Sequence, residues 1–166
     1  MTNTEKNSAI YNKAMKFSKA ILNRLKERDY FGDMGLGGYC VLLEAVKHTE
    51  LGAFYEYRQL SEQIRLHVNK AIERDITKWP YYTRRPSNYI RTADSIFYKD
   101  NEDILQVELD YIIDTRPKAS VWGITWSWFE NNDIYPKEFA ISENWWKAIG
   151  AIETMKLLRA FNRLEG

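Results

Sequence analysis

The sequence predicts an all-α protein, an array of helical hairpins in one domain spanning residues 1–166. Apolar residues recur at the helical period of about 3.6 residues over several long stretches that hold no proline. Two aromatic-rich stretches interrupt that pattern, and we expect them to form long loops. A hydrophobic content of 45% excludes a disordered chain, and 166 residues are enough to bury a core.

The first half of the chain predicts three helices in succession. Over residues 8–29 an apolar stripe lies opposite a basic, polar face, and glycine follows the stretch as a usual stop signal. Residues 36–48 leave almost no polar face, which predicts a helix buried on all sides. The amphipathic pattern returns over residues 53–77. An inner helix between two outer ones predicts a layered array.

The helical pattern stops over residues 78–99, the first aromatic loop. The segment 79–89 holds two prolines and four aromatic rings. A helix is expected next over residues 101–114, with acidic residues at its positive N-terminal end. Pro117 ends it, because proline disfavours the α conformation in the residue before it.

The second aromatic loop is expected over residues 118–140. Tryptophans alternate with small residues over 121–129, which suits a strand, yet the same rings would share one helix face. Strand, helix and irregular structure all stay open there. Ser142 is predicted as the N-cap of a last helix over residues 143–163, with Glu143 in its first turn.

Composition narrows the function classes. The chain holds 24 Lys+Arg against 23 Asp+Glu, whereas a dedicated nucleic-acid binder usually carries a clear basic excess. Cys40 is the single cysteine, which excludes an internal disulfide framework, and in an apolar helix we expect an inert buried thiol. We expect His48 and His67 on helix surfaces, so no metal site is predicted. No nucleotide-binding motif is present, so no cofactor is predicted either.

The charges of the first loop and the following helix are complementary. Residues 78–91 hold four cations and no acid, whereas residues 100–114 hold six acids and no cation. The favoured interpretation is that the two segments meet through bidentate pairs, formed by Arg84, Arg85 or Arg116 with Asp110 or Asp114. The alternative places these arginines in a pocket for an anion or a polar ligand.

Five of the 6 tryptophans lie between residues 122 and 146. They either anchor the loops as a core or line a cleft in which rings stack on a ligand. The spacing identifies no catalytic pair, so the catalytic residues stay unknown. The candidate ligand-binding residues are Arg84, Arg85, Asn88, Tyr98, Arg116, Trp122, Trp126, Trp128, Glu143 and Trp145.

A resemblance to known proteins is carried by the segments 85–88, 95–98, 114–117, 122–128 and 141–146. They resemble the C-terminal half of uncharacterised bacterial proteins that look like helical α/α toroids, the architecture of terpenoid cyclases and prenyltransferases. The likeness covers mainly residues 79–164 and implies an open toroid-like arc rather than an activity. No Asp-rich diphosphate-binding motif or zinc triad is present, so no catalytic residue is carried over.

The sequence therefore favours a protein that binds a polar small molecule or carbohydrate in an aromatic and arginine-lined cleft, with catalysis left open. The alternative is a self-association or protein-interaction module that forms a homo-oligomer through exposed rings. Contact with single-stranded nucleic acid is a third, disfavoured reading. No run of eighteen apolar residues and no secretory signal are seen, so we expect a cytoplasmic protein without a membrane partner.

Overall fold

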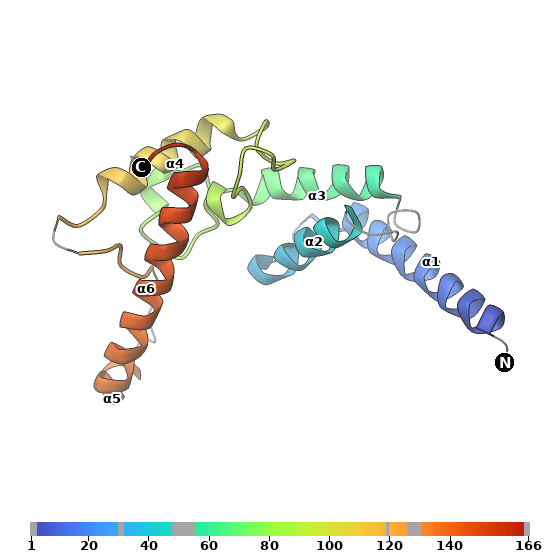
Figure 1. The fold of residues 1–166 in the computed structure, drawn as a ribbon, viewed down its shortest axis with the longest axis horizontal. Helices are drawn as coiled ribbons and strands as arrows, with labels where there is room; N and C mark the ends of the chain where they lie inside the picture. Colours follow the sequence, from blue (N-terminus) through green and yellow to red (C-terminus); the bar gives the residue numbers. More distant parts are fainter. Residues whose placement is uncertain (1–2, 30–31, 48–55, 119, 126–130, 165–166) are drawn as a thin grey trace. The chain divides into compact units, whose positions relative to one another are not determined.

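The structure, a computed structural model, describes residues 3–29, 32–47, 56–118, 120–125 and 131–164. These residues form six α-helices and two short 3₁₀ helices, and no strand occurs among them (Figure 1). The all-α fold class is therefore confirmed. Nothing in the structure tests the toroid-like arc, which stays a prediction.

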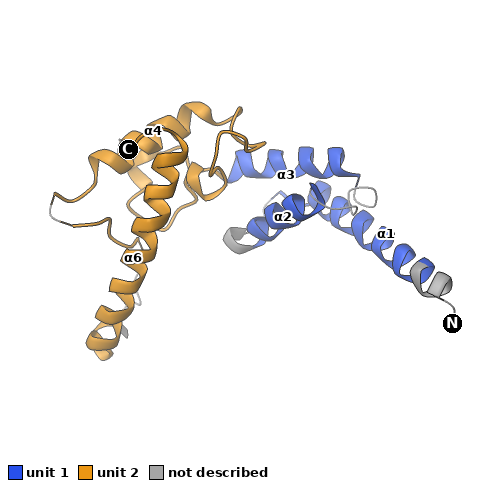
Figure 2. Cartoon of the chain, in the orientation of Figure 1, with its two compact units in different colours: residues 1–71 blue, residues 72–166 orange. Residues whose placement is uncertain are grey.

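The chain divides into two compact units, the N-terminal unit of residues 1–71 and the C-terminal unit of residues 72–166 (Figure 2). Each unit is described by itself below. The single domain expected over residues 1–166 stays a prediction.

Three helices make the N-terminal unit: α1 (Asn3–Glu27), α2 (Gly32–Lys47) and α3 (Tyr57–Ala71). α3 packs against both α1 and α2. Apolar side chains from all three helices are fully buried at the centre of this unit: Leu25, Leu43, Val46, Leu60, Ile64 and Val68. Burial of these stripes holds the unit together.

The expectation that the second helix is buried on all sides is wrong. Val41 is 71% exposed, and the buried side chains of α2 (Leu36, Leu43 and Val46) form a single stripe. Because α2 packs mainly against α3, one stripe covers that contact and the opposite face stays in solvent.

His67 also differs from its expected surface position. It is buried, and its Nε2 lies 2.6 Å from the carbonyl oxygen of Leu25. His67 follows Ile64 by three residues, so it belongs to the inward stripe of α3, and the ring hydrogen bond satisfies its polar atom there. His48 lies outside the described residues.

Helix α3 ends at Ala71, six residues before the predicted end at residue 77. The Asp75 side chain accepts hydrogen bonds from the backbone N–H and the hydroxyl of Thr77. This local bonding starts a separate 3₁₀ turn, η2 (Ile76–Lys78), in place of another α-helical turn.

The C-terminal unit contains η2, a second 3₁₀ turn η3 (Pro86–Asn88), and the helices α4 (Glu102–Asp114), α5 (Asn131–Ile134) and α6 (Pro136–Ala160). Residues 78–99 contain no α-helix, as predicted, and α4 matches the predicted helix to within one residue. The buried side chains at the centre of this unit include Trp79, Ile90, Leu105, Leu109 and Leu158.

The start of the last helix was predicted wrongly. α6 begins at Pro136, so Ser142 lies inside the helix and is not its N-cap. Proline suits the first helical turn, because its missing N–H would have no partner there. Residues 120–125 are irregular rather than a strand, whereas residues 126–130 lie outside the described residues.

Candidate functional site

A closed loop over residues 73–84 forms one wall of the candidate site. The backbone N–H of Glu73 donates to the carbonyl of Arg84 at 2.8 Å, which joins the two ends of the loop. Trp79 lies buried within it, and its indole Nε1 donates to the Glu73 carbonyl at 2.9 Å. The ring also meets Tyr111 of α4 edge to face, with centroids 5.2 Å apart. The loop is thereby fixed to α4.

A polar cluster follows this loop, and we call its members, Arg85, Ser87 and Glu108, the Glu108 cluster. Ser87 and Glu108 are buried. The Ser87 backbone N–H donates to Glu108 Oε2 at 2.7 Å, and the Ser87 hydroxyl donates to Oε1 at 2.6 Å. The Nε of Arg85 lies 3.4 Å from the same Oε1. The carboxylate therefore accepts two hydrogen bonds from Ser87 and forms an ion pair with Arg85.

Glu108 is fully buried because of its position on α4. It follows Ile104 by four residues and precedes Ile112 by four, so it lies on the apolar stripe that faces the core. Burial raises the pKa of Glu108, while the Ser87 hydroxyl, the Arg85 charge, the Ser87 N–H and the more distant Arg91 charge lower it by less. A carboxylate in such a place needs its partners to offset desolvation.

The turn η3 gives Arg85 and Ser87 their positions. Pro86 occupies the first position of the turn, and the Asn88 side chain oxygen accepts a hydrogen bond from the Arg85 backbone N–H at 2.7 Å. This bond fixes the backbone on both sides of Pro86. Asn88 therefore shapes the turn, and it does not line the cavity described below.

The basic loop and the acidic helix do meet, but through other residues than the predicted pairs. Glu108 pairs with Arg85, whereas Asp110 pairs with Arg163 at 2.9 Å. Arg116 lies over the ring of Trp122, with its guanidinium carbon 5.9 Å from the ring centroid. The predicted contact between the segments is confirmed for Arg85, while its partner on the helix was predicted wrongly.

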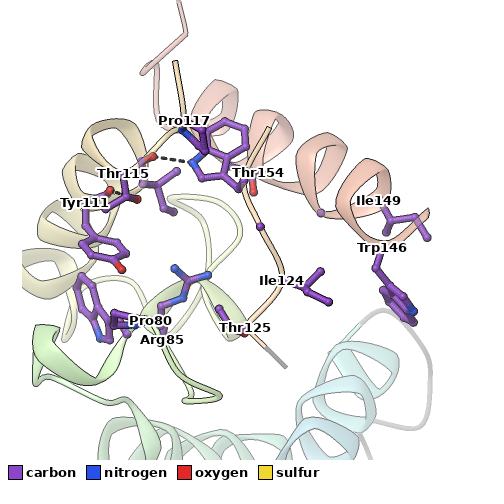
Figure 3. Close-up of a pocket in the computed structure, with 15 residues that line it drawn as sticks. Pro80, Arg85, Tyr111, Thr115, Pro117, Ile124, Thr125, Trp146, Ile149 and Thr154 are labelled. Carbon is purple, nitrogen blue, oxygen red and sulfur yellow. Dashed lines mark hydrogen bonds between the residues drawn. The ribbon is translucent and has the colours of Figure 1, made fainter. Parts of the chain in front are cut away.

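A cavity of about 400 Å³ lies beside the Glu108 cluster within the C-terminal unit (Figure 3). It is lined by Trp79, Pro80, Arg85, Tyr111, Ile112, Thr115, Pro117, Trp122, Gly123, Ile124, Thr125, Trp146, Ile149, Gly150 and Thr154. Arg85 is the only charged residue among these described lining residues.

The arrangement of the lining residues is visible in Figure 3. The guanidinium of Arg85 projects into the cavity between Tyr111 and Thr125. Tyr111 and Thr115 come from α4 and its end, whereas Trp146 and Ile149 come from α6 on the opposite side. Trp122 donates its indole N–H to the Ile112 carbonyl at 2.7 Å, which holds its ring against the end of α4. Rings and hydroxyls thus surround one cation.

The sequence-predicted site residues divide into two groups. Arg85 and Trp122 line the cavity, and Arg116 contacts the Trp122 ring. Arg84 lies 5.8 Å from the Tyr82 ring centroid and does not line the cavity.

The other candidates have separate local partners or stand apart. The Tyr98 hydroxyl donates to Glu102 at 2.9 Å, which raises the pKa of Tyr98, and its ring packs on Phe161. Glu143 pairs with Lys147 at 2.7 Å, and Trp145 is 72% exposed. None of these three lines the cavity. Trp126 and Trp128 lie outside the described residues.

Sequence reasoning missed Glu108 and Tyr111 as members of this site. A signal for Glu108 was present, because an acid on the apolar stripe of a helix implies buried partners. Tyr111 gave no comparable signal, since a tyrosine next to a buried stripe is common in helix cores.

The described residues define an all-helical protein whose C-terminal unit carries a ring-lined cavity with one arginine. No set of three or more His, Cys, Asp or Glu side chains gathers as a metal site in the described part of the chain. None of the described helices has the length and apolar character needed to cross a membrane. Compared with protein-family models, curated proteins and solved structures, the chain matches none.

Proposed function

We propose that the C-terminal unit binds a polar small molecule or carbohydrate in the cavity beside the Glu108 cluster. The observation that supports this most is the Arg85 guanidinium, which projects between the Tyr111 ring and Thr125 into a space of about 400 Å³. Ligand sites are mostly apolar concave pockets of roughly 300–1,000 Å³ with a few placed polar groups. The Trp122 and Tyr111 rings would contact a ligand face, and the threonine hydroxyls would contact its polar groups.

Tryptophan fluorescence and ligand-observed NMR test this proposal. Monosaccharides and small polar ring compounds are screened for binding to the full chain, and the hits are measured again with Trp122→Ala. We expect this variant to weaken binding by about tenfold or more, because stacking on an aromatic ring contributes on the order of 1–3 kcal/mol.

Trp145→Ala is the matched control. It removes the same ring from a position that is 72% exposed and outside the cavity, so it should leave the affinity unchanged. Equal losses in the two variants, or an absence of hits for the unmodified chain, would contradict the proposed cavity function.

A second candidate function is self-association through α6. Residues 141, 145, 148, 152 and 155 follow the alternating four and three spacing of a coiled-coil seam. Ile141, Trp145, Ile152 and Met155 on this seam are between 45% and 72% exposed. Antiparallel pairing with a second copy would set Ile141 opposite Met155 and Trp145 opposite Ile152, so the seam is complementary to itself.

Sedimentation velocity separates the two functions. Self-association predicts a dimer whose fraction rises with protein concentration and falls in Trp145→Ala, while Trp122→Ala dimerises like the unmodified chain. A strict monomer at high concentration removes this candidate. We also propose that the protein resides in the cytoplasm and that its fold resembles that of α/α-toroid proteins.

A further inference from the structure

We infer that the ligand of the cavity carries a carboxylate group, and that this group pairs with the two terminal nitrogens of Arg85. The inference rests on the proposed function and names the chemical class of the ligand. It follows from three features of Arg85, namely its orientation, its remaining donors and its place as the one charged residue among the described lining residues.

The orientation of Arg85 is set from behind by the Glu108 cluster. Glu108 is fully buried, and its contact with Arg85 is formed through Nε at 3.4 Å. Two bonds from Ser87 keep the carboxylate from turning. A guanidinium whose Nε forms an ion pair with a fixed partner loses less freedom when a ligand binds than an unpaired one, and such preorganisation favours affinity.

The remaining donors of Arg85 point to the cavity. Within the described part of the chain, neither Nη1 nor Nη2 has a hydrogen bond, and the side chain is 30% exposed. In Figure 3 the end of the guanidinium faces the open space between Tyr111 and Thr125. The planar pair of N–H groups matches the two oxygens of a carboxylate, which gives two parallel charge-assisted hydrogen bonds.

The charge at the site favours a carboxylate over a phosphate. Arg85 is the one charged residue among the described lining residues, and part of its charge is already shared with Glu108. A phosphate monoester carries a charge of about −1.5 to −2 at pH 7, whereas a carboxylate carries a single charge. A phosphate bound here would leave more of its charge without a cationic partner among the described lining residues than a carboxylate would.

The rest of the cavity suits the body of an organic acid. The Trp122 ring and Ile149 provide apolar surface, while the hydroxyls of Thr115 and Thr154 offer donors and acceptors. The expected ligand therefore has a carboxylate at one end and a ring or compact apolar face beside it, as in a carbocyclic acid or a sugar acid.

Matched pairs of probes test the inference in the full chain. Cyclohexanecarboxylate is compared with cyclohexanecarboxamide, glucuronate with glucose, and cyclohexyl phosphate serves as the alternative anion. Affinities come from calorimetry and from the fluorescence of the cavity indoles. We expect each carboxylate to bind about tenfold or more tightly than its neutral partner. Arg85→Gln should reduce this preference to within about threefold.

Arg74→Gln is the control for Arg85→Gln. Arg74 also pairs with an acid of α4, Asp103, but it does not line the cavity, so its variant should keep the full carboxylate preference. If Arg85→Gln alone does not fold, the double variant Arg85→Gln with Glu108→Gln replaces it, since it leaves no unpaired charge in the core.

The outcomes are distinguishable. If the neutral probes bind as tightly as the carboxylates, or cyclohexyl phosphate binds more tightly than both acids, the carboxylate inference is overturned while the proposed cavity function stands. If no probe binds the unmodified chain, both are overturned.

Discussion

The bond between Ser87 and Glu108 offers the sharpest test of how the candidate site is held together. Ser87→Ala removes the hydroxyl that donates to Glu108 at 2.6 Å and changes little else, because alanine has nearly the same volume. The backbone N–H of Ser87 keeps its own bond to the second carboxylate oxygen.

The expected loss follows from the burial of both residues. Ser87 is 8% exposed and Glu108 is fully buried, so water does not replace the lost donor. A hydrogen bond to a charged group contributes roughly 1.5–3 kcal/mol. We therefore expect the free energy of unfolding of the C-terminal unit to fall by about 2 kcal/mol.

Urea unfolding followed by tryptophan fluorescence measures this loss. All 6 tryptophans lie in residues 72–166, so their emission reports the C-terminal unit alone. Ser120→Ala, at an exposed position of the same unit, is the control and should change the free energy by less than about 0.5 kcal/mol. If Ser87→Ala also changes it by less than that, the carboxylate does not depend on this hydroxyl and our account of the cluster is refuted.

Three further predictions concern titration and the N-terminal unit. Burial raises the pKa of Glu108 above 4.5, so the stability it contributes is complete below pH 4.5 and is lost as the pH rises through the folded-state pKa. In Glu108→Gln the free energy of unfolding, measured with urea, should no longer fall over this pH range. The same fall in the variant would contradict the assignment to Glu108. His67→Ala loses the bond to Leu25 and leaves a cavity. Urea unfolding followed by circular dichroism should therefore show that the free energy of unfolding of the N-terminal unit falls by about 2–3 kcal/mol. The tryptophan emission should change at the same urea concentration as in the unmodified chain. Burial, and to a lesser degree Glu44, raises the pKa of Cys40 from 9.0 to about 11, so Ellman's reagent should react about 100-fold more slowly with the folded chain than with the urea-unfolded chain. Equal rates would refute that assignment.

Much of the fold follows from periodicity in the sequence. The stripe of α4 and the prolines of the first loop placed both elements correctly, because burial of an apolar stripe and the geometry of proline act locally. Helix α6 could not be placed in the same way. Its apolar residues predict the later part of the helix, but a proline at position 136 is as compatible with a loop as with the first helical turn that it occupies.

The candidate site was predictable in kind but not in detail. Opposite charges on the basic loop and the acidic helix indicated that they would meet, and they do so at Arg85. Counting charges did not identify the partner, because Asp110 and Asp114 point away from the core whereas Glu108 lies on its apolar face. The cavity itself depends on where α6 passes the end of α4, and residues distant in sequence set that separation.

The closed loop of residues 73–84 can be lengthened at its tip without disturbing the candidate site. Its ends are joined by a backbone hydrogen bond and its interior is filled by Trp79, whereas Tyr81 at its tip is 70% exposed. Extra residues at the tip would therefore extend into solvent without shifting the start of η3. This position should accept a peptide tag or a foreign epitope, and homologues of different length should differ there while Arg85 keeps its place.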